Sequence, residues 1–277
     1  MRDRIRTEIV DHVAHVQMVR TDKMNAVDGA MFDALIDAGK RLRQETDLRA
    51  VVLSGEGRAF CAGIDLTTLS GDAGDVKIEM GARTFEGMNI LQYCAMQWRL
   101  LPVPVIAAIH DIAYGAGFQL ALGADMRFVA PAARCSIMEI KWGLVPDMAA
   151  MHLLRGLVRP DIAAELIFSG RVFSGVEAER LGLATRLSKD PAAEALAFAK
   201  EIAGRSPDAI RAGKRLLSLQ DDRLRDRILL AESIEQEELL RSPNHAEALR
   251  SGLAQEQARF GPAQAAPFIP EVGNDRG

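Results

Sequence analysis

The chain has 277 residues, of which 48% are hydrophobic and 26% are charged. This composition supports a packed core and excludes an intrinsically disordered chain. The formal net charge of −4 argues against nucleic acid as the main partner. No apolar run reaches the roughly eighteen residues that a membrane-spanning helix needs, so we expect no membrane association.

The three cysteines, Cys61, Cys94 and Cys135, do not have the paired spacing of a metal site. Their odd number, together with an N-terminus that lacks the apolar core of a secretory signal, fits a reducing compartment. We therefore expect a cytoplasmic protein without a metal site.

The first half of the chain alternates strand and helix patterns. Two strands are predicted over 5–10 and 12–20, and a helix is predicted after an N-cap at Asp28. Further strands are predicted over 50–53, 103–109, 126–129 and 135–138, with a mobile surface loop over 67–76 and a long helix over about 77–100.

The last third of the chain is predicted to be helical. The expected helices cover 148–157, 161–168, 174–181, 191–204, 206–219, 222–241 and 244–256. The pattern predicts an α/β core over 1–200, a C-terminal helical region over 201–260 and a flexible tail over 261–277.

Two turns made of small residues follow strands, Ala62-Gly63-Ile64 and Gly115-Ala116-Gly117. Small residues let a ligand approach the backbone closely, and the start of a helix presents free N–H groups. If both turns face one pocket, the amides of Ile64 and Ala116 could bind one carbonyl oxygen. Glycine-rich turns are common, so ordinary turn chemistry is the alternative explanation of the same residues at this point.

Other glycine motifs are excluded by their spacing. Leu120 stands where a dinucleotide-binding fingerprint needs its third glycine, which argues against a nicotinamide enzyme. The sequence also lacks a phosphate-binding loop with Gly-Lys-Ser/Thr, a Gly-x-Ser-x-Gly elbow and a His/Glu metal motif.

Two carboxylates lie in apolar surroundings, Glu139 and Asp147. Burial would raise the pKa of such groups and suit them to proton transfer. Each also has a structural interpretation, Glu139 as a cap of the next turn and Asp147 as the N-cap of the following helix. We interpret His110 as a buried histidine with its hydrogen bonds satisfied and Trp142 as a packing residue.

Several motifs resemble those of the enoyl-CoA hydratase/isomerase (crotonase) superfamily, in a consistent order over about residues 5–260. The motifs are Phe60-Cys61-Ala62-Gly63-Ile64-Asp65-Leu66, the run from Pro104 to Ile109 that leads to Gly115-Ala116-Gly117-Phe118-Gln119-Leu120-Ala121, the block from Met138 to Pro146, and the block from Ser169 to Leu183.

The resemblance implies a ClpP-like spiral of ββα units whose C-terminal helices build a trimer or a dimer of trimers. It implies an acyl-CoA substrate, whose CoA is part of the substrate rather than a separate cofactor. It places the Ile64 and Ala116 amides in an oxyanion hole. It further implies substrate contacts from Lys23, Ala26, Ala62, Gly63, Asp65 and Gly115.

The departures from the family pattern bear on the reaction. Hydratases of the family use two glutamates, of which the second matches Glu139 and the first falls on Gln119. Because glutamine cannot accept a proton from water, the resemblance favours double-bond isomerisation by Glu139, with Asp147 as a second acid/base or orienting group and Gln119 as a polar positioner. Hydration of a 2-enoyl-CoA stays the main alternative. Thioester hydrolysis and CoA binding without catalysis are the others.

One further departure from the family pattern means that the resemblance does not define the rim of the pocket. His110-Asp111 stands where the family commonly has Asn-Gly. The sequence does not define the acyl group.

Overall fold

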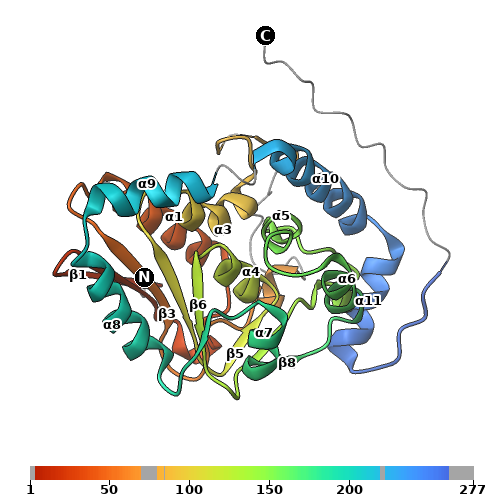
Figure 1. Cartoon of the computed structure of the whole chain (residues 1–277). Coiled ribbons are helices and arrows are strands. Elements are labelled where there is room, and N and C mark those ends of the chain that lie inside the picture. Colours follow the sequence, from red (N-terminus) through yellow and green to blue (C-terminus); the bar gives the residue numbers. More distant parts are fainter. Residues whose placement is uncertain (1–3, 70–79, 84, 219–221, 262–277) are drawn as a thin grey trace, which may run out of the picture.

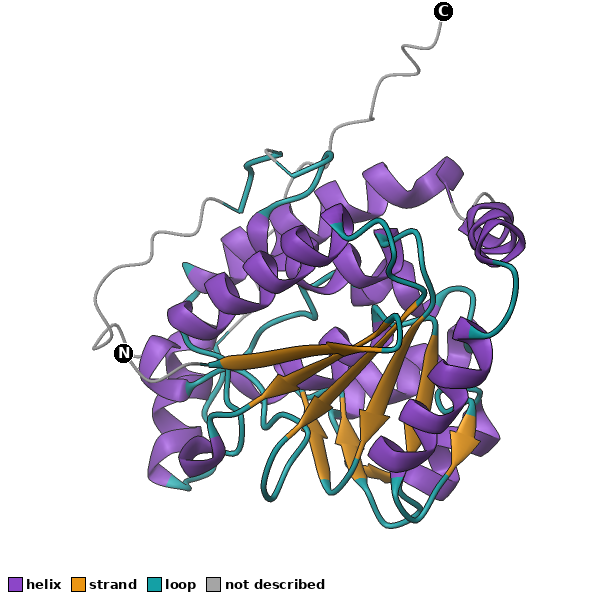
Figure 2. Ribbon diagram, turned by 90° about the vertical axis from the view of Figure 1, so that its left-hand side faces the viewer, coloured by secondary structure: helices purple, strands orange, loops and turns teal. Residues whose placement is uncertain are grey.

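The computed structural model describes residues 4–69, 80–83, 85–218 and 222–261. Its centre is a six-stranded sheet with the strand order β1-β2-β3-β4-β6-β9 (Figures 1 and 2). Only β1 and β2 are antiparallel, and the other neighbouring strands are parallel. The strands are β1 (Ile5–Val10), β2 (Val13–Met18), β3 (Ala50–Gly55), β4 (Val105–Ile109), β6 (Met126–Val129) and β9 (Arg186–Leu187).

Both faces of the sheet are covered, which is why β3 and β4 are buried at every position and read as continuous apolar runs. Val52, Ile106 and Phe128 point to one face and pack against α8 (Pro191–Ala203). Alternate residues such as Val51 and Ala107 point to the other face, where the larger core includes residues of α1 (Gly29–Gln44), α3 (Ile90–Leu100) and α4 (Ala116–Leu122).

A second sheet of three strands stands beside the first, with the order β5-β7-β8. Its strands are β5 (Ile112–Tyr114), β7 (Arg134–Ser136) and β8 (Phe173–Ser174). Single bridges connect Cys61 to Ala113 and Val27 to Ile64, and so join the loop after β3 to this second layer and to the segment before α1. The loop after β3 and strand β5, which are far apart in sequence, therefore lie side by side.

The remaining helices are distributed over the chain from the loop after β3 to the C-terminal region. They include α2 (Leu66–Leu69), α5 (Ala150–Leu154), α6 (Pro160–Ser169), α7 (Gly175–Leu181), α9 (Pro207–Ser218), α10 (Asp222–Leu240) and α11 (Pro243–Ala254), with 3-10 turns η1 (Thr21–Lys23) and η2 (Glu139–Trp142). The α10 helix runs past α5 (Figure 1), and α11 packs on η2. The C-terminal helices thus cover the side of the molecule that carries Glu139.

Most predicted elements are confirmed, including the Asp28 N-cap, whose carboxylate accepts from Met31 N at 2.8 Å. The long helix over 77–100 was wrong at its start. Glu86 and Gly87 have φ of 52° and 83°, so the chain turns there, and α3 begins only after the N-cap Asn89. The predicted loop over 67–76 is helical up to Leu69. Residues 70–76 of that predicted loop lie outside the described residues.

Smaller differences concern short elements. The strand predicted over 135–138 ends at Ser136, and β5, β8 and β9 were not predicted. The domain division at residue 200 stays a prediction, and the predicted tail lies outside the described residues beyond 261. No helix within the described ranges is long and apolar enough to span a membrane.

Candidate active site

The two small-residue turns meet at the end of the central sheet. Cys61 N donates to Ile112 O at 3.0 Å, and Tyr114 N donates to Cys61 O at 3.1 Å, so the loop after β3 runs alongside β5. Gly63 has φ of 98°, and a Cβ atom placed there would lie 2.8 Å from Tyr114 O. Only glycine accommodates both this conformation and this close approach.

The turns leave two backbone donors available. Within the described part of the chain, neither Ile64 N nor Ala116 N donates to an acceptor. Both residues line the same cavity of about 360 Å³. A Cβ atom at Gly63 would lie 3.9 Å from Ala116 N, which shows how closely the two turns approach.

The cavity collects most of the predicted site residues. Ala62, Gly63, Ile64, Gly115, Ala116, Gln119, Glu139 and Asp147 all line it, and the rest of the lining is mainly apolar: Phe32, Leu66, Met80, Leu91, Tyr114, Met138, Trp142, Leu144, Met148, Gln236 and Leu240. An apolar cavity with a few convergent polar groups is typical of a small-molecule site.

Glu139 and Gln119, which both line this cavity, are hydrogen-bonded to each other. Gln119 is fully buried, and its Nε2 donates to Glu139 Oε1 at 2.6 Å. Gln119 Oε1 accepts from Met148 N at 2.9 Å. Since a backbone N–H can only donate, it fixes the oxygen of the amide on its side and turns the NH₂ group toward Glu139.

The other oxygen of Glu139 is buried and has no hydrogen-bond partner in the described structure. Burial raises the pKa of the Glu139 carboxyl to about 7, and the nearby charge of Asp147 acts in the same direction. Burial also raises the pKa of Asp147 to about 7. Two carboxyls that titrate near neutrality in one cavity can both take and give protons.

The α10 helix supplies polar groups that the sequence interpretation missed. Gln236 lines the cavity, and its Oε1 accepts from Val145 N at 3.2 Å. Glu232 lies one turn earlier, where burial raises the pKa of its carboxyl to about 8. The two residues are at least 81 positions away in sequence from the backbone groups that they bind, and local pattern gives no signal for such contacts.

Three predicted substrate-binding residues do not line the cavity. Lys23 is exposed at the end of η1, and Ala26 accepts a bond from Arg20 through its carbonyl. Asp65 pairs with Arg20 at 2.8 Å and accepts from Thr67 Oγ1 at 2.9 Å. The contacts of the Asp65 carboxylate with Arg20 and Thr67 therefore hold the loop after Ile64 in place.

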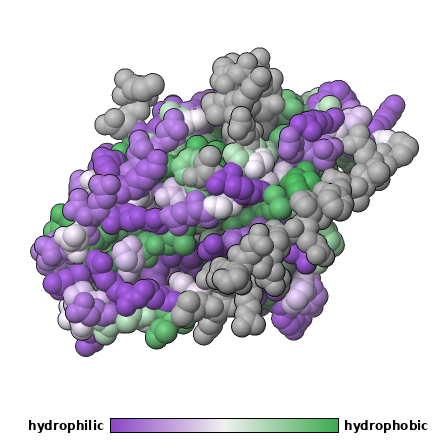
Figure 3. All heavy atoms as spheres, turned by 90° about the horizontal axis from the view of Figure 1, so that it is seen from above, coloured by the Kyte–Doolittle hydropathy of each residue, from purple (hydrophilic) through white to green (hydrophobic). Residues whose placement is uncertain are grey.

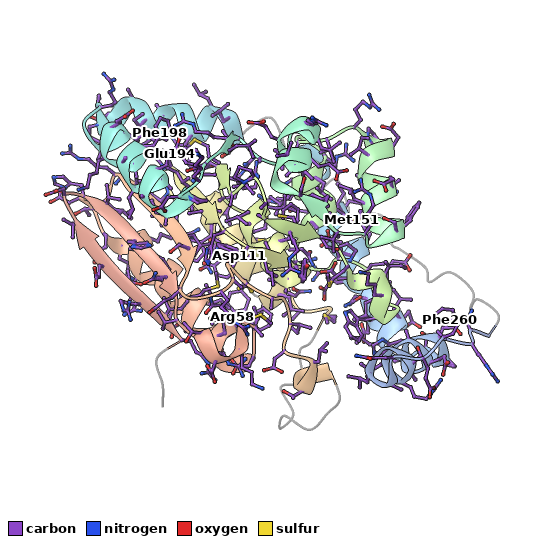
Figure 4. The ribbon with its side chains drawn as sticks, turned by 90° about the horizontal axis from the view of Figure 1, so that it is seen from below. Arg58, Asp111, Met151, Glu194, Phe198 and Phe260 are labelled. Carbon is purple, nitrogen blue, oxygen red and sulfur yellow. The ribbon has the colours of Figure 1, made fainter. Side chains whose placement is uncertain are left out.

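The turn His110-Asp111 lies outside the cavity. Asp111 has φ of 47°, a left-handed conformation that Asn and Gly also favour. His110 is half-buried rather than buried as predicted, and its Nε2 lies 2.9 Å from Gly57 O. Figure 4 shows Arg58 and Asp111 on the two neighbouring turns. Trp142, expected only to pack, also lines the cavity.

Within the described ranges, no three or more His, Cys, Asp or Glu side chains lie together so that they could hold a metal ion. All three cysteines are buried and unpaired. Viewed from above, the surface is mainly hydrophilic with hydrophobic patches between the polar side chains (Figure 3).

Sheet, turns and cavity define the chain as a crotonase-fold protein, and comparison with solved structures agrees. An enoyl-CoA hydratase/isomerase from Mycobacterium paratuberculosis superposes with a TM-score of 0.82 at 25% identity, over 91% of this chain and 99% of that one. A second, from Pseudoalteromonas atlantica, gives a TM-score of 0.82 at 24% identity, over 93% of this chain and 100% of that one.

Sequence comparisons give the family. The Enoyl-CoA hydratase/isomerase family model matches residues 8–260. A Mycobacterium tuberculosis protein named "Probable enoyl-CoA hydratase EchA14" is 34% identical over 76% of this chain and 80% of its own. The human mitochondrial Delta(3,5)-Delta(2,4)-dienoyl-CoA isomerase is 31% identical over 75% of this chain and 66% of its own. The chain belongs to the enoyl-CoA hydratase/isomerase family.

Proposed function

We propose that the protein moves a proton between carbons of an enoyl-CoA, with the thioester oxygen held by the N–H groups of Ile64 and Ala116. Glu139 removes a proton from the carbon next to the thioester carbonyl of a 3-enoyl-CoA. The electron pair moves onto the oxygen, and protonation at the far end of the resulting dienolate gives the 2-enoyl-CoA. Two amides aimed at the oxygen would stabilise its charge, since one such donor is worth about 2.7–4 kcal/mol.

One observation carries the preference for isomerisation over hydration. Both polar groups of the Gln119 amide are hydrogen-bonded: its NH₂ group donates to Glu139, and its oxygen accepts from Met148 N. It can neither accept a proton nor turn an oxygen toward a water held beside Glu139. The free oxygen of Glu139 then acts as the main base and acid, with Asp147 as a second acid/base or orienting group.

Relatives named as hydratases and as dienoyl-CoA isomerases make both reactions chemically reasonable for this chain. Hydration of a 2-enoyl-CoA is therefore the second candidate. We expect no separate cofactor, and we propose that Lys23 and Ala26 lie along the CoA arm, with Asp65 holding the adjoining turn.

The oligomeric state and the cellular compartment are proposed from exposed apolar side chains and from the cysteines. Large apolar side chains are exposed on several helices, among them Phe168 on α6, Leu216 and Leu217 on α9 and Leu253 on α11. Large exposed apolar groups occur at association surfaces, so we propose a homotrimer or a dimer of trimers. Sedimentation equilibrium tests this, and a monomer would contradict it. The unpaired cysteines support a reducing compartment such as the cytoplasm.

The reaction is tested by assaying a 2-enoyl and a 3-enoyl thioester with the wild type, Glu139→Gln and Gln119→Glu. We expect the wild type to isomerise the 3-enoyl substrate, and Glu139→Gln to lose about 10²–10⁴-fold in kcat/KM. Gln119→Glu should gain hydration at the expense of isomerisation.

Other outcomes separate the alternatives. Fast hydration of the 2-enoyl substrate that survives in Glu139→Gln contradicts the assignment. Release of free CoA would identify a thioesterase. Binding of acyl-CoA without any turnover would identify a binding protein.

A further inference from the structure

Trp142 is an aromatic wall of the cavity beside the proposed acid. It lies at the end of η2, three residues after Glu139, and both residues line the cavity. Side chains three residues apart in a 3-10 turn eclipse each other, so the indole and the carboxyl project from the same side of η2. An acyl group whose reacting carbon meets Glu139 therefore passes close to Trp142.

The backbone around Trp142 is held from outside the cavity by α11. His245 on α11 is only 7% exposed, and its Nδ1 lies 2.6 Å from Trp142 O. Because a carbonyl oxygen can only accept, Nδ1 carries the proton and donates it. A Cβ atom placed at Gly143 would lie 3.0 Å from His245 Cα and 3.3 Å from Ala248 Cβ. The helix and the end of η2 are thus in close contact.

The ring of Trp142 contacts the same helix two turns later. A Cβ atom placed at Gly252 would lie 3.0 Å from Cζ3 of the indole, closer than an ordinary van der Waals contact. His245, Ala248 and Gly252 are spaced by three and four residues, which puts them on one face of α11. The Trp142 side chain therefore reaches from Gly252 to the cavity, and α11 opposes its movement away from the cavity.

The lining around Trp142 is apolar. Met138 and Leu144, which lie on either side of η2 in sequence, and Leu240 on α10 line the same cavity. Apolar walls bind a hydrocarbon chain by burying it, and each buried methylene strengthens binding roughly fourfold. This gain ends where the chain meets a side chain that has no room to move.

We propose that Trp142 is a specificity-determining residue that limits the length of the acyl group, and that α11 sets this limit from behind the indole through His245 and Gly252. The cavity accepts straight acyl chains up to the length at which they meet the indole. This role rests on the proposed function, because the acyl group must occupy the cavity beside Glu139. Among the described residues, none from α11 lines the cavity, so the helix acts only through Trp142.

The test is calorimetric binding of saturated acyl-CoAs, from butyryl-CoA to dodecanoyl-CoA, which occupy the site without net reaction. In the wild type we expect the affinity to rise roughly fourfold for each added methylene up to a limiting chain length. Trp142→Leu removes the ring and should move this limit to longer chains, with a gain of about tenfold or more for dodecanoyl-CoA. Gly252→Ala presses the ring toward the cavity and should move the limit to shorter chains.

The matched control is Gly213→Ala. Gly213 also lies in a helix, α9, but a Cβ atom placed there meets nothing within 4 Å. Alanine is a better helix former than glycine, so neither glycine substitution should weaken its helix. We expect Gly213→Ala to keep the limiting chain length of the wild type.

The same limiting chain length in the wild type and in folded Trp142→Leu overturns the role of the indole. An unchanged limit in Gly252→Ala overturns the role of α11, and it overturns both roles if Trp142→Leu does not fold. Failure of every acyl-CoA to bind the wild type would contradict the proposed acyl-CoA function, and the size limit with it. Because binding needs no turnover, a shifted limit is independent of which reaction the wild type catalyses.

Discussion

At the scale of single residues, Gly115 links the proposed oxyanion donors to the proposed acid. Its φ is 49°, and a Cβ atom placed there would lie 3.2 Å from Glu139 Oε1. The position therefore needs glycine both for its backbone conformation and for the space that the carboxylate occupies. The Ala116 N–H follows directly, so a shift at Gly115 would move both groups.

We predict that Gly115→Ala destabilises the fold by about 1–2 kcal/mol and lowers kcat much more than it raises KM. Gly57→Ala is the matched control, because Gly57 also has a positive φ of 83° and a Cβ contact of 3.1 Å with Thr21, but does not line the cavity. Thermal unfolding and steady-state kinetics separate the two effects. Equal loss of kcat in both variants would show that strain alone is responsible.

The roles of some of these residues could be predicted from the sequence, and the roles of others could not. Glycine at 63 and 115 is readable from the chain because the turns need it locally. The interpretation of Glu139 stayed open without the family resemblance, because nothing local distinguishes a capping carboxylate from a buried one. Gln236 and Glu232 could not be found, since their roles come from contacts with a loop far away in sequence.

At the scale of secondary-structure elements, the start of α3 was the largest error. Apolar spacing predicted a helix from about 77, whereas the chain turns at Glu86 and Gly87 and starts the helix at Asn89. The Asn89 side chain accepts from Gln92 N at 2.9 Å and donates to Ser233 Oγ at 3.0 Å on α10. A capping box joined to a distant helix therefore decides where α3 begins.

We predict that Asn89→Ala costs about 2–4 kcal/mol, because it removes a cap and leaves buried partners unsatisfied. It should also lower activity, since α3 and α10 both line the cavity. Asp190→Ala removes the exposed N-cap of α8, far from the cavity, and should cost about 1 kcal/mol without loss of activity. Chemical denaturation with kinetics measures both. An Asn89→Ala enzyme with full activity would rule out this coupling.

At the scale of the whole molecule, the sheet order and the helical C-terminal region agree with the predicted α/β core. Hydrophobic periodicity and the turn residues were enough to predict this architecture, because buried parallel strands appear as short apolar runs between glycine-rich turns. The very short strands β8 and β9 were missed because two residues give no periodicity.

Three buried carboxyls should make the stability of the molecule depend on pH. Folding raises the pKa of Glu139 and Asp147 to about 7 and that of Glu232 to about 8. The folded state then keeps protons that the unfolded chain releases, so the free energy of unfolding falls as pH rises. The effect begins above the unfolded pKa values and is complete near the folded ones.

We predict a fall of at least about 2 kcal/mol in the free energy of unfolding between pH 5 and pH 8, measured by chemical denaturation. The Glu139→Gln variant should show a smaller fall, because one of the three groups no longer titrates. Asp28 and Asp65, whose pKa values are lowered, act only as pH falls below about 4. A stability that is constant or rises over this range would contradict the burial of these groups.

The most direct measurement is a crystal structure with an unreactive acyl-CoA thioester bound. The account predicts the thioester oxygen about 2.7–3.1 Å from the nitrogens of both Ile64 and Ala116, with the free oxygen of Glu139 beside the adjacent carbon. A thioester oxygen that contacts only one of these nitrogens or neither, or a Glu139 carboxylate turned away from the acyl group, would contradict it.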